Sequence, residues 1–235
     1  MSSFAPQELL SELERLGFIR TNGHFMQSDE RHHMSTFIAT RFMMTCPSLI
    51  HALCEKMAHE IAGDTRFVAS SPGSSFGLML AFVLTKKLGH DVHSVFIDNY
   101  ANNGHYTPDP AHQRLVSGLT GVLFDPTINN HRVSRRNVEA AERLGGRISA
   151  TVSFCNHGGY TPETLWVDRI HALISQEDMV QRYGDGVTPY VERECPMCDE
   201  GMPLNLEFGY ALRNQRRKER FAAQQALAQQ HSQAA

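Results

Sequence analysis

Apolar residues recur with helical spacing in two stretches near the start of the chain. Residues 7–16 place four leucines on one face of a helix, and Gly17 follows where helices commonly end. From Leu49 to Ile61 an apolar residue recurs every four positions, which predicts an amphipathic helix over residues 48–62. Each of these helices is therefore expected to pack one face against a core.

Strands and helices then alternate along the chain. Residues 18–26 predict a short strand or a hairpin, interrupted at Asn22-Gly23, a pair that favours tight turns. Further strands are predicted at 66–69, 92–97, 121–124, 148–154 and 169–174, and helices at 76–88 and 134–144. Ser134 is the expected N-cap of the latter helix. Ser175 and Asp178 resemble a capping box that opens one more short helix.

This alternation predicts the fold class. Strands separated by helices at this spacing favour parallel pairing, so we expect an α/β protein with an open parallel sheet flanked by helices. In such sheets ligands bind at the carboxyl ends of the strands, on the loops that lead into helices. Candidate chemistry is therefore sought on those loops.

Composition narrows the class of protein. The chain has 235 residues, of which 41% are hydrophobic and 20% charged, which excludes a collagen, a coiled coil and a disordered tail. Its net charge of −3 gives no electrostatic reason to expect a nucleic-acid or membrane partner. The five cysteines are mostly isolated, and the first residues lack the basic start and apolar core of a signal peptide. We expect a cytoplasmic protein.

The first candidate loop, residues 70–75, lies between a predicted strand and a predicted buried helix. It consists of serines, a proline and a glycine, small residues that let backbone N–H groups approach an anion at a helix N-terminus. An ordinary tight turn between a strand and a helix has the same composition. Both interpretations stay open for this loop.

The second candidate loop, residues 125–134, follows the predicted strand at 121–124. Arg132, Arg135 and Arg136 lie at the start of the next helix. Positive charge there interacts unfavourably with the helix dipole and costs a few tenths to about 1 kcal/mol of stability per residue. A bound anion would reverse the sign of that effect. Alternatively, the arginines point into solvent.

The sequence contains one Cys-x-x-Cys pair, Cys195 and Cys198. A structural zinc site needs four ligands, usually from two such pairs, and this sequence has no second pair. We therefore expect no metal site formed by protein side chains alone. A thioredoxin-like redox role is disfavoured because the pair lies far from the first strand and helix.

Three segments resemble the orotate phosphoribosyltransferase family, over about residues 7–210. Near the N-terminus, Gly23, His24 and Phe25 precede Arg31 and His32, as in the part of that family called the hood. The stretch VASSPGSSFGLMLAFVLTKKLG stands where the family has a strand, a pyrophosphate loop and a buried helix. The most specific match is ECPMCDEGMPLN, which resembles the family's Cys-Pro-x-Cys-x-x-Gly-x-Pro segment.

The resemblance implies a fold, a reaction and an assembly. It implies an α/β core over 48–184, with hood segments at 1–47 and 185–214 and a Gln/Ala-rich tail at 215–235. It also implies transfer of a phosphoribosyl group from phosphoribosyl pyrophosphate to a base nitrogen, with Mg²⁺ bound through the pyrophosphate, in a homodimer. The reaction passes through an oxocarbenium-like state, so carboxylates, cations and backbone amides must orient and stabilise the donor.

The family's functional motifs are altered in this chain. Where the family has two adjacent acids, this chain has Asp125 followed by Pro126. Where the family has a phosphate-binding Thr-Thr-Gly-Gly-Ser segment, this chain has His131-Arg132-Val133-Ser134 in place of the glycines. Side chains with a Cβ atom block the close approach that glycine permits. The family's mobile loop supplies lysines, whereas the basic residues in this part of the chain are His105, His112 and Arg114. His157 stands in place of the arginine with which the family engages the base.

Two main hypotheses follow. In the first, the chain is a divergent transferase that uses the same or a related phosphosugar donor. In the second, it is a non-catalytic relative that binds a nucleotide or a phosphate. A different chemistry, such as hydrolysis assisted by histidine, is a third hypothesis. As a transferase, its catalytic candidates are Asp125, His105, Arg31 and His32. The expected substrate- and phosphate-binding residues are Ser71, Gly73, Ser74, Ser75, His131, Arg132, Ser134, Arg135 and His157. Each also has a plain structural alternative as a loop cap, a turn residue or a surface side chain.

Overall fold

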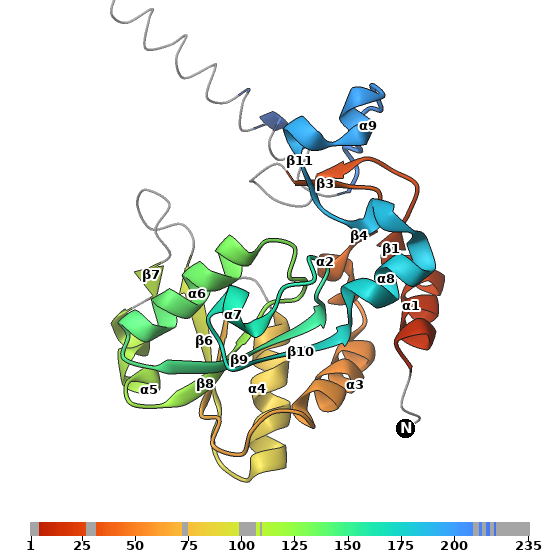
Figure 1. The fold of residues 1–235 in the computed structure, drawn as a ribbon. Coiled ribbons are helices and arrows are strands. Elements are labelled where there is room, and N and C mark those ends of the chain that lie inside the picture. Colours follow the sequence, from red (N-terminus) through yellow and green to blue (C-terminus); the bar gives the residue numbers. More distant parts are fainter. Residues whose placement is uncertain are drawn as a thin grey trace, which may run out of the picture.

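The structure is a computed structural model that describes residues 5–26, 32–71, 75–98, 107–108 and 110–208, together with 212, 215, 216 and 219. A mixed sheet of six strands forms its centre, in the order β10-β9-β8-β5-β6-β7 (Figure 1). Five strands run parallel, and only the edge strand β7 is antiparallel. The strands are β5 (Phe67–Ser70), β6 (His93–Asp98), β7 (Thr107–Pro108), β8 (Thr120–Phe124), β9 (Arg147–Cys155) and β10 (Arg169–Ile174). The predicted α/β class is confirmed.

Helices cover both faces of this sheet. On one face α3 (Pro47–Ala58) and α4 (Ser75–Leu88) pack together with α1 (Pro6–Arg15). On the other face α6 (His131–Arg143) buries Val138 and Ala141 against the strands. Further helices within the described ranges are α2 (Thr40–Met43), α5 (Gln113–Val116), α7 (Pro162–Leu165), α8 (Gln176–Tyr183) and α9 (Pro196–Asp199), with single 3₁₀ turns at 110–112, 185–187 and 192–194.

Aromatic packing fixes α4 to the middle of the sheet. Phe76 on α4 lies with its ring centroid 4.8 Å from that of Phe154 on β9 and 5.9 Å from that of Phe124 on β8. All three side chains are buried. Such edge-to-face and tilted arrangements contribute about 0.5–1.5 kcal/mol per pair beyond the burial of their area. The cluster therefore aligns β8 and β9 beneath the start of α4.

A second, smaller sheet lies beside this core and joins distant parts of the chain. We call it the hood sheet; its antiparallel strands are β2 (Phe25–Met26), β3 (His32–Met34) and β11 (Tyr190–Val191), in the order β11-β3-β2. Figure 1 shows it with α9 above one end of the core. A separate pair, β1 (Ile19–Arg20) and β4 (Phe37–Ile38), connects the hood sheet to the core.

Local signals predicted some boundaries well and others poorly. The capping box of α8 is confirmed: the Ser175 hydroxyl accepts from the Asp178 N–H at 3.1 Å, and the Asp178 carboxylate accepts from the Ser175 N–H at 2.8 Å. The predicted N-cap of α6 was wrong. The helix begins three residues before Ser134, because the Asn130 side chain accepts the Arg132 N–H at 2.9 Å and caps it there.

Residues 18–26, predicted as a short strand or a hairpin, contain two short strands that do not form a hairpin with each other. Asn22 does adopt a left-handed turn conformation, with a φ of 55°. However, β1 and β2 on either side of it pair with β4 and β3, not with each other. The turn therefore sends the chain from one small sheet into another. Across the described ranges, no helix combines the length and the apolar character that crossing a membrane requires.

We expect Gly77→Ala to destabilise the fold. A Cβ atom at this position on α4 would lie 2.4 Å from the Ser70 Oγ and 2.7 Å from the Ser70 Cβ on β5, so the helix must move away from the sheet. Overpacking of this kind costs about 1–3 kcal/mol, partly offset by the better helix propensity of alanine. Urea unfolding measures the loss.

Two variants give the comparison for that measurement. Gly63→Ala adds a methyl group with no atom within 4 Å, so its free energy of unfolding should stay within about 0.5 kcal/mol of the wild type. Adding Ser70→Gly to Gly77→Ala removes the clashing atoms and should restore part of the loss. Equal stability of Gly77→Ala and the wild type would show that α4 does not approach β5 this closely.

Candidate functional site

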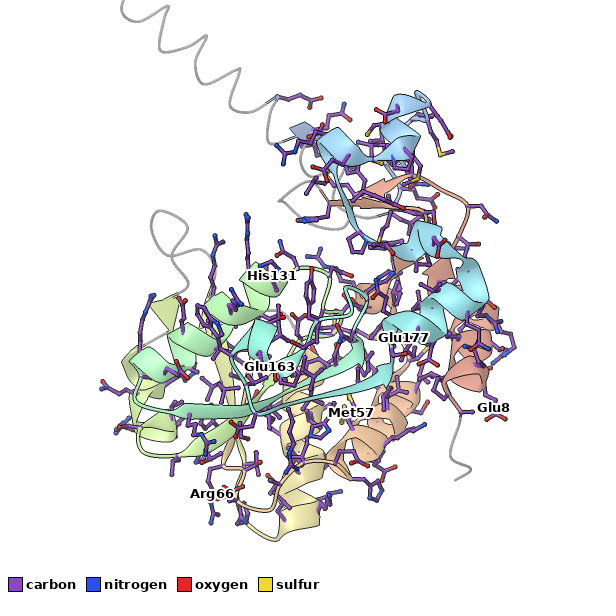
Figure 2. The ribbon with its side chains drawn as sticks, in the orientation of Figure 1. Glu8, Met57, Arg66, His131, Glu163 and Glu177 are labelled. Atoms are coloured by element: carbon purple, nitrogen blue, oxygen red, sulfur yellow. The ribbon has the colours of Figure 1, made fainter. Side chains whose placement is uncertain are left out.

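The carboxyl ends of three neighbouring parallel strands meet at one edge of the core. Ser71 follows β5, Asp125 follows β8, and Asn156 follows β9. Figure 2 shows His131 at this edge, where α6 begins, and Arg66, which precedes β5, at the opposite edge. Ser71 and Asp125, the described residues at the start of the two candidate loops, therefore lie at the same edge of the sheet, next to adjacent strands.

Asp125 is held within this edge. The hydroxyl of Ser134, which is fully buried, donates to the Asp125 Oδ2 at 2.7 Å. Burial raises the pKa of the Asp125 carboxyl from 3.8 to about 6, although hydrogen bonds from Ser134 and from the Thr127 backbone oppose this. The carboxyl is thus ionised at neutral pH and gains a proton in mild acid.

The loop after β8 is fixed to the loop after β9. The Tyr160 hydroxyl donates to the Asn129 carbonyl at 3.2 Å, and the Gly158 N–H donates to the Ile128 carbonyl at 2.9 Å. The Asn129 Oδ1 lies 3.1 Å from the His157 Nδ1. These contacts hold the segment between Asp125 and α6 as one unit with β9.

His157 is part of the interior of this unit. Its side chain is fully buried, and burial lowers its pKa to about 4, so the imidazole is neutral at physiological pH. The sequence analysis assigned it to the position of a base-engaging arginine. In this conformation it offers neither positive charge nor exposed surface, so it acts on the edge by positioning Asn129.

The arginines at the start of α6 face different ways. Arg135 donates from Nε to the Thr164 carbonyl, and its guanidinium carbon lies 4.4 Å from the centre of the Trp166 ring. It is therefore engaged with α7 and the residue after it, not with the loop of Asp125. Arg132 is exposed in the first turn of α6. His131 is half-buried, and its ring meets that of Tyr160 edge-on at 5.3 Å.

The other predicted residues fall into three groups. Ser71 is half-buried at the end of β5, and Ser75 is exposed as the first residue of α4. His32 is half-buried in β3 of the hood sheet. Four predicted residues lie outside the described ranges: Arg31, Gly73, Ser74 and His105.

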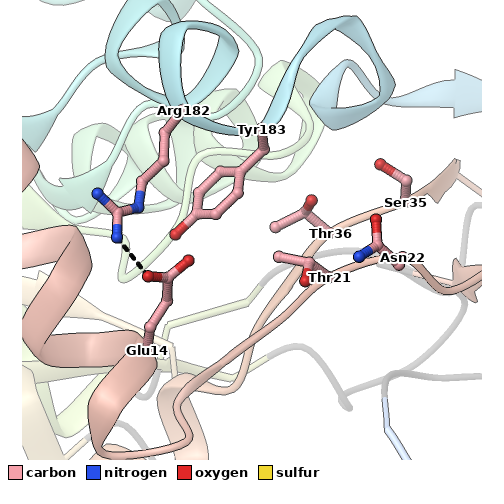
Figure 3. Close-up of a pocket in the computed structure, with 7 residues that line it drawn as sticks. All are labelled: Glu14, Thr21, Asn22, Ser35, Thr36, Arg182 and Tyr183. Atoms are coloured by element: carbon pink, nitrogen blue, oxygen red, sulfur yellow. Dashed lines mark hydrogen bonds and ion pairs between the residues drawn. The ribbon is translucent and has the colours of Figure 1, made fainter.

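A cavity of about 510 Å³ opens between helices α1 and α8 and the turns that join β1 to β2 and β3 to β4 (Figure 3). Glu14 and Arg182 form an ion pair on its wall, and burial together with Glu14 raises the pKa of Tyr183. The lining residues are Glu14, Thr21, Asn22, Ser35, Thr36, Arg182 and Tyr183. No sequence motif marked this cavity, because its walls come from segments far apart in the chain.

The hood also contains a cluster that the sequence analysis did not predict. His24 and His33 lie beside Cys195 and Cys198, and their four ligand atoms are all within 4.8 Å of one another. The Cys-x-x-Cys pair thus has partners from a different part of the chain. The 13 histidines of the sequence were the one signal available, and they gave no indication of which two would approach the pair.

Comparison with known proteins places this architecture in a class. No model of a known protein family matches the chain. The orotate phosphoribosyltransferase of Erythrobacter litoralis is 28% identical over 150 residues, covering 63% of this chain and 74% of that protein.

Solved structures agree with that likeness. The orotate phosphoribosyltransferase of Aeropyrum pernix superposes with a TM-score of 0.56 at 14% identity, over 75% of this chain and 98% of that one. The Mycobacterium tuberculosis orotate phosphoribosyltransferase superposes with a TM-score of 0.52 at 15% sequence identity, over 75% of this chain and 99% of that one. The adenine phosphoribosyltransferase of Thermoanaerobacter pseudethanolicus superposes with a TM-score of 0.51 at 15% sequence identity, over 71% of this chain and 99% of that one. The chain has the type I phosphoribosyltransferase fold. The resemblance to the orotate phosphoribosyltransferases, predicted from the sequence, is confirmed.

We expect Asp125→Asn to become more stable relative to the wild type as the pH rises. The folded chain holds the Asp125 proton more tightly than the unfolded chain, so ionisation between about pH 4 and 6 disfavours the folded wild type. From pH 4 to pH 7 the free energy of unfolding of the variant, minus that of the wild type, should rise by up to about 3 kcal/mol. Urea titrations across this range measure it.

An exposed carboxylate provides the matched control. Asp64 lies in the turn before β5, at the opposite edge of the sheet. The difference between Asp64→Asn and the wild type should change little over the same pH range. A difference for Asp125→Asn that is equally flat would contradict the raised pKa.

Proposed function

We propose that this chain is a phosphoribosyltransferase of the orotate phosphoribosyltransferase type, acting in pyrimidine metabolism. It transfers a phosphoribosyl group from phosphoribosyl pyrophosphate, or a related phosphosugar donor, to a base nitrogen. The fold and the named relatives support this at the level of the class. The proposed arrangement has a core over 48–184 with hood segments at 1–47 and 185–214.

The observation that carries the proposal is the position of Asp125. It stands at the carboxyl end of β8, directly beside the position of Ser71 at the end of β5. A donor with a ribose between a phosphate and a pyrophosphate needs a carboxylate for the ribose hydroxyls between two anion-binding loops. Asp125, ionised at neutral pH, meets that requirement.

The anionic groups of the donor would be held on either side. Ser71, Gly73, Ser74 and Ser75 would bind the pyrophosphate, and Arg132 in the first turn of α6 would reach the 5′-phosphate. Mg²⁺ would enter on the pyrophosphate, since Mg²⁺ in such sites is held mainly by substrate phosphates with one or two carboxylates. Asp125 is the one acidic residue of its loop, which fits a metal carried by the donor. Arg31 and His32 remain proposed contacts from the hood, and His105 remains a proposed contact to the leaving group.

A second function is favoured by specific contacts. Pro126 replaces the second acid, the Ser134 hydroxyl is directed to Asp125, and Arg135 is engaged with Thr164 and Trp166. Each removes a group that a catalytic donor site would use. In this alternative the chain binds a nucleotide or a phosphate at the same edge, without turnover.

We also propose that the chain works as a cytoplasmic homodimer. Leu78 and Phe82 lie one turn apart on α4 with 57% and 48% of their surfaces exposed. A second copy of the chain that covers Leu78 and Phe82 would bury their apolar surface, which contributes about 25 cal/mol of favourable free energy per Å².

Replacement of Leu78 by lysine tests the dimer. The charge would have to be buried in the interface, so Leu78→Lys should shift the protein from dimer to monomer at micromolar concentration. Sedimentation velocity on the variant and the wild type measures the shift. A wild-type chain that sediments as a monomer contradicts the homodimer.

Pyrophosphate release tests the transferase. Purified chain, phosphoribosyl pyrophosphate and Mg²⁺ are combined with orotate and then with the common bases, and release is followed against a protein-free blank. We expect release with at least one base, reduced about 100-fold in Asp125→Ala because the ribose loses its orienting contact. Asp64→Ala, at the opposite edge, should retain the wild-type rate.

Thermal unfolding with the same ligands separates the alternatives. A ligand at 100 times its dissociation constant stabilises the folded chain by about 2.7 kcal/mol. Stabilisation of the wild type without release supports the binding protein. Neither release nor stabilisation, in a folded sample, would overturn both functions.

A further inference from the structure

Four metal-binding side chains converge in the hood from two distant parts of the chain. His24 directly precedes β2 and His33 lies in β3, whereas Cys195 and Cys198 flank the start of α9. His24, His33 and Cys195 are buried, and Cys198 is half-buried. We propose that these four residues form a structural zinc site that joins the two hood segments. This site is independent of the proposed transferase reaction.

Four of the distances are close to the edges of a single tetrahedron, two of them shorter than the ideal edge by about 0.4 Å. The His24 Nε2 lies 2.9 Å from the His33 Nδ1 and 3.6 Å from each of the two cysteine sulfurs. The His33 Nδ1 lies 3.2 Å from the Cys198 Sγ. Zinc bonded to nitrogen at about 2.05 Å and to sulfur at about 2.3 Å requires edges of about 3.3 Å for N–N and 3.6 Å for N–S. The remaining pairs also lie within 4.8 Å.

The surroundings orient His24 for this role. Its Nδ1 lies 2.7 Å from the Met202 carbonyl oxygen, which accepts only a hydrogen bond, so Nδ1 carries the proton. The Nε2 therefore presents its lone pair to the cluster. A metal-bound histidine commonly donates its other N–H to a backbone carbonyl in this way. The His24 carbonyl in turn accepts the Asn205 N–H at 2.8 Å, which fixes the backbone on both sides of the ring.

The cysteine pair is equally well arranged. The Cys198 N–H donates to the Cys195 carbonyl at 3.0 Å, and the Gly201 N–H donates to the Cys198 carbonyl at 3.0 Å. These turns bring both thiols to the same side of the backbone, facing the histidines, while both cysteines remain free. On binding, each thiol releases its proton to solvent, and two thiolates with two neutral imidazoles balance the charge of Zn²⁺.

The donor set selects the ion. Two sulfurs and two nitrogens in a tetrahedron suit zinc, whereas magnesium and calcium require oxygen ligands. A two-iron cluster with the same ligands would place the cysteine pair and the histidine pair on different irons. Here the His24 Nε2 stands 3.6 Å from both sulfurs, which leaves room for one ion only.

The hood needs such a link. Its sheet consists of strands of two or three residues, and a sheet this small buries little apolar area of its own. The cluster connects β2 and β3 to the segment that follows β11. Zinc would therefore supply the stability of the hood, while the parallel core has its own packed interior.

Metal content tests the site directly. The full chain is expressed with zinc in the medium, purified without chelators, and analysed by inductively coupled plasma mass spectrometry. We expect about one zinc ion per chain. Cys198→Ser and His33→Gln should reduce this at least about tenfold, as the loss of a ligand weakens a four-ligand site. Cys46→Ser and His51→Gln, which lie outside the cluster, should keep the full amount.

Spectroscopy of the wild type keeps the proposal testable if the ligand variants do not fold. The reduced chain, stripped with a chelator and titrated with Co²⁺, should develop the visible bands of tetrahedral cobalt and a thiolate-to-cobalt charge-transfer band. Limited proteolysis of the stripped chain should cleave the hood before the core. Wild-type chain without stoichiometric zinc and without these cobalt bands would overturn the site. Zinc retained at full occupancy in folded Cys198→Ser and His33→Gln would overturn it too.

Discussion

The close packing of α4 on the middle strands is the constraint on which the rest of the structure depends. Gly77 allows the helix to approach Ser70, and Phe76 then meets the rings of Phe124 and Phe154. Because β5, β8 and β9 are parallel, aligning them under one helix also aligns their carboxyl ends. The loops that bear the candidate chemistry are thus brought together by the apolar layer beneath them. The polar residues of those loops can change without loss of the framework.

This separation allows the loop after β8 to have an organisation of its own. Residues 125–134 contain no glycine, and side-chain contacts hold the loop in place. Asn129 connects it to Tyr160 and His157, and Ser134 connects it to Asp125. The loop that carries Asp125 is therefore fixed by side-chain contacts to the segment after β9 and to α6.

The elements that the sequence predicted well carry their signals locally. The continuous apolar surface of α4 and the capping box of α8 are each complete within a few residues. The start of α6 was missed because Asn130 and Ser134 are both competent caps, and the choice between them depends on Ser134 contacting Asp125. The cluster in the hood was not predicted, because it depends on contacts between segments far apart in the chain. His24 and His33 meet Cys195 only because β3 pairs with β11, and no spacing in the sequence records that pairing.

The hood has a consequence for the order in which the protein forms during synthesis. His24 and Met202, which contact each other, are separated by 178 positions. At about 5–20 residues per second, the ribosome needs about 10–35 s to cover that distance. Over that interval the whole parallel sheet leaves the ribosome, while β2 and β3 have no β11 to pair with. The core is therefore assembled first, and the hood is the last part of the chain to close.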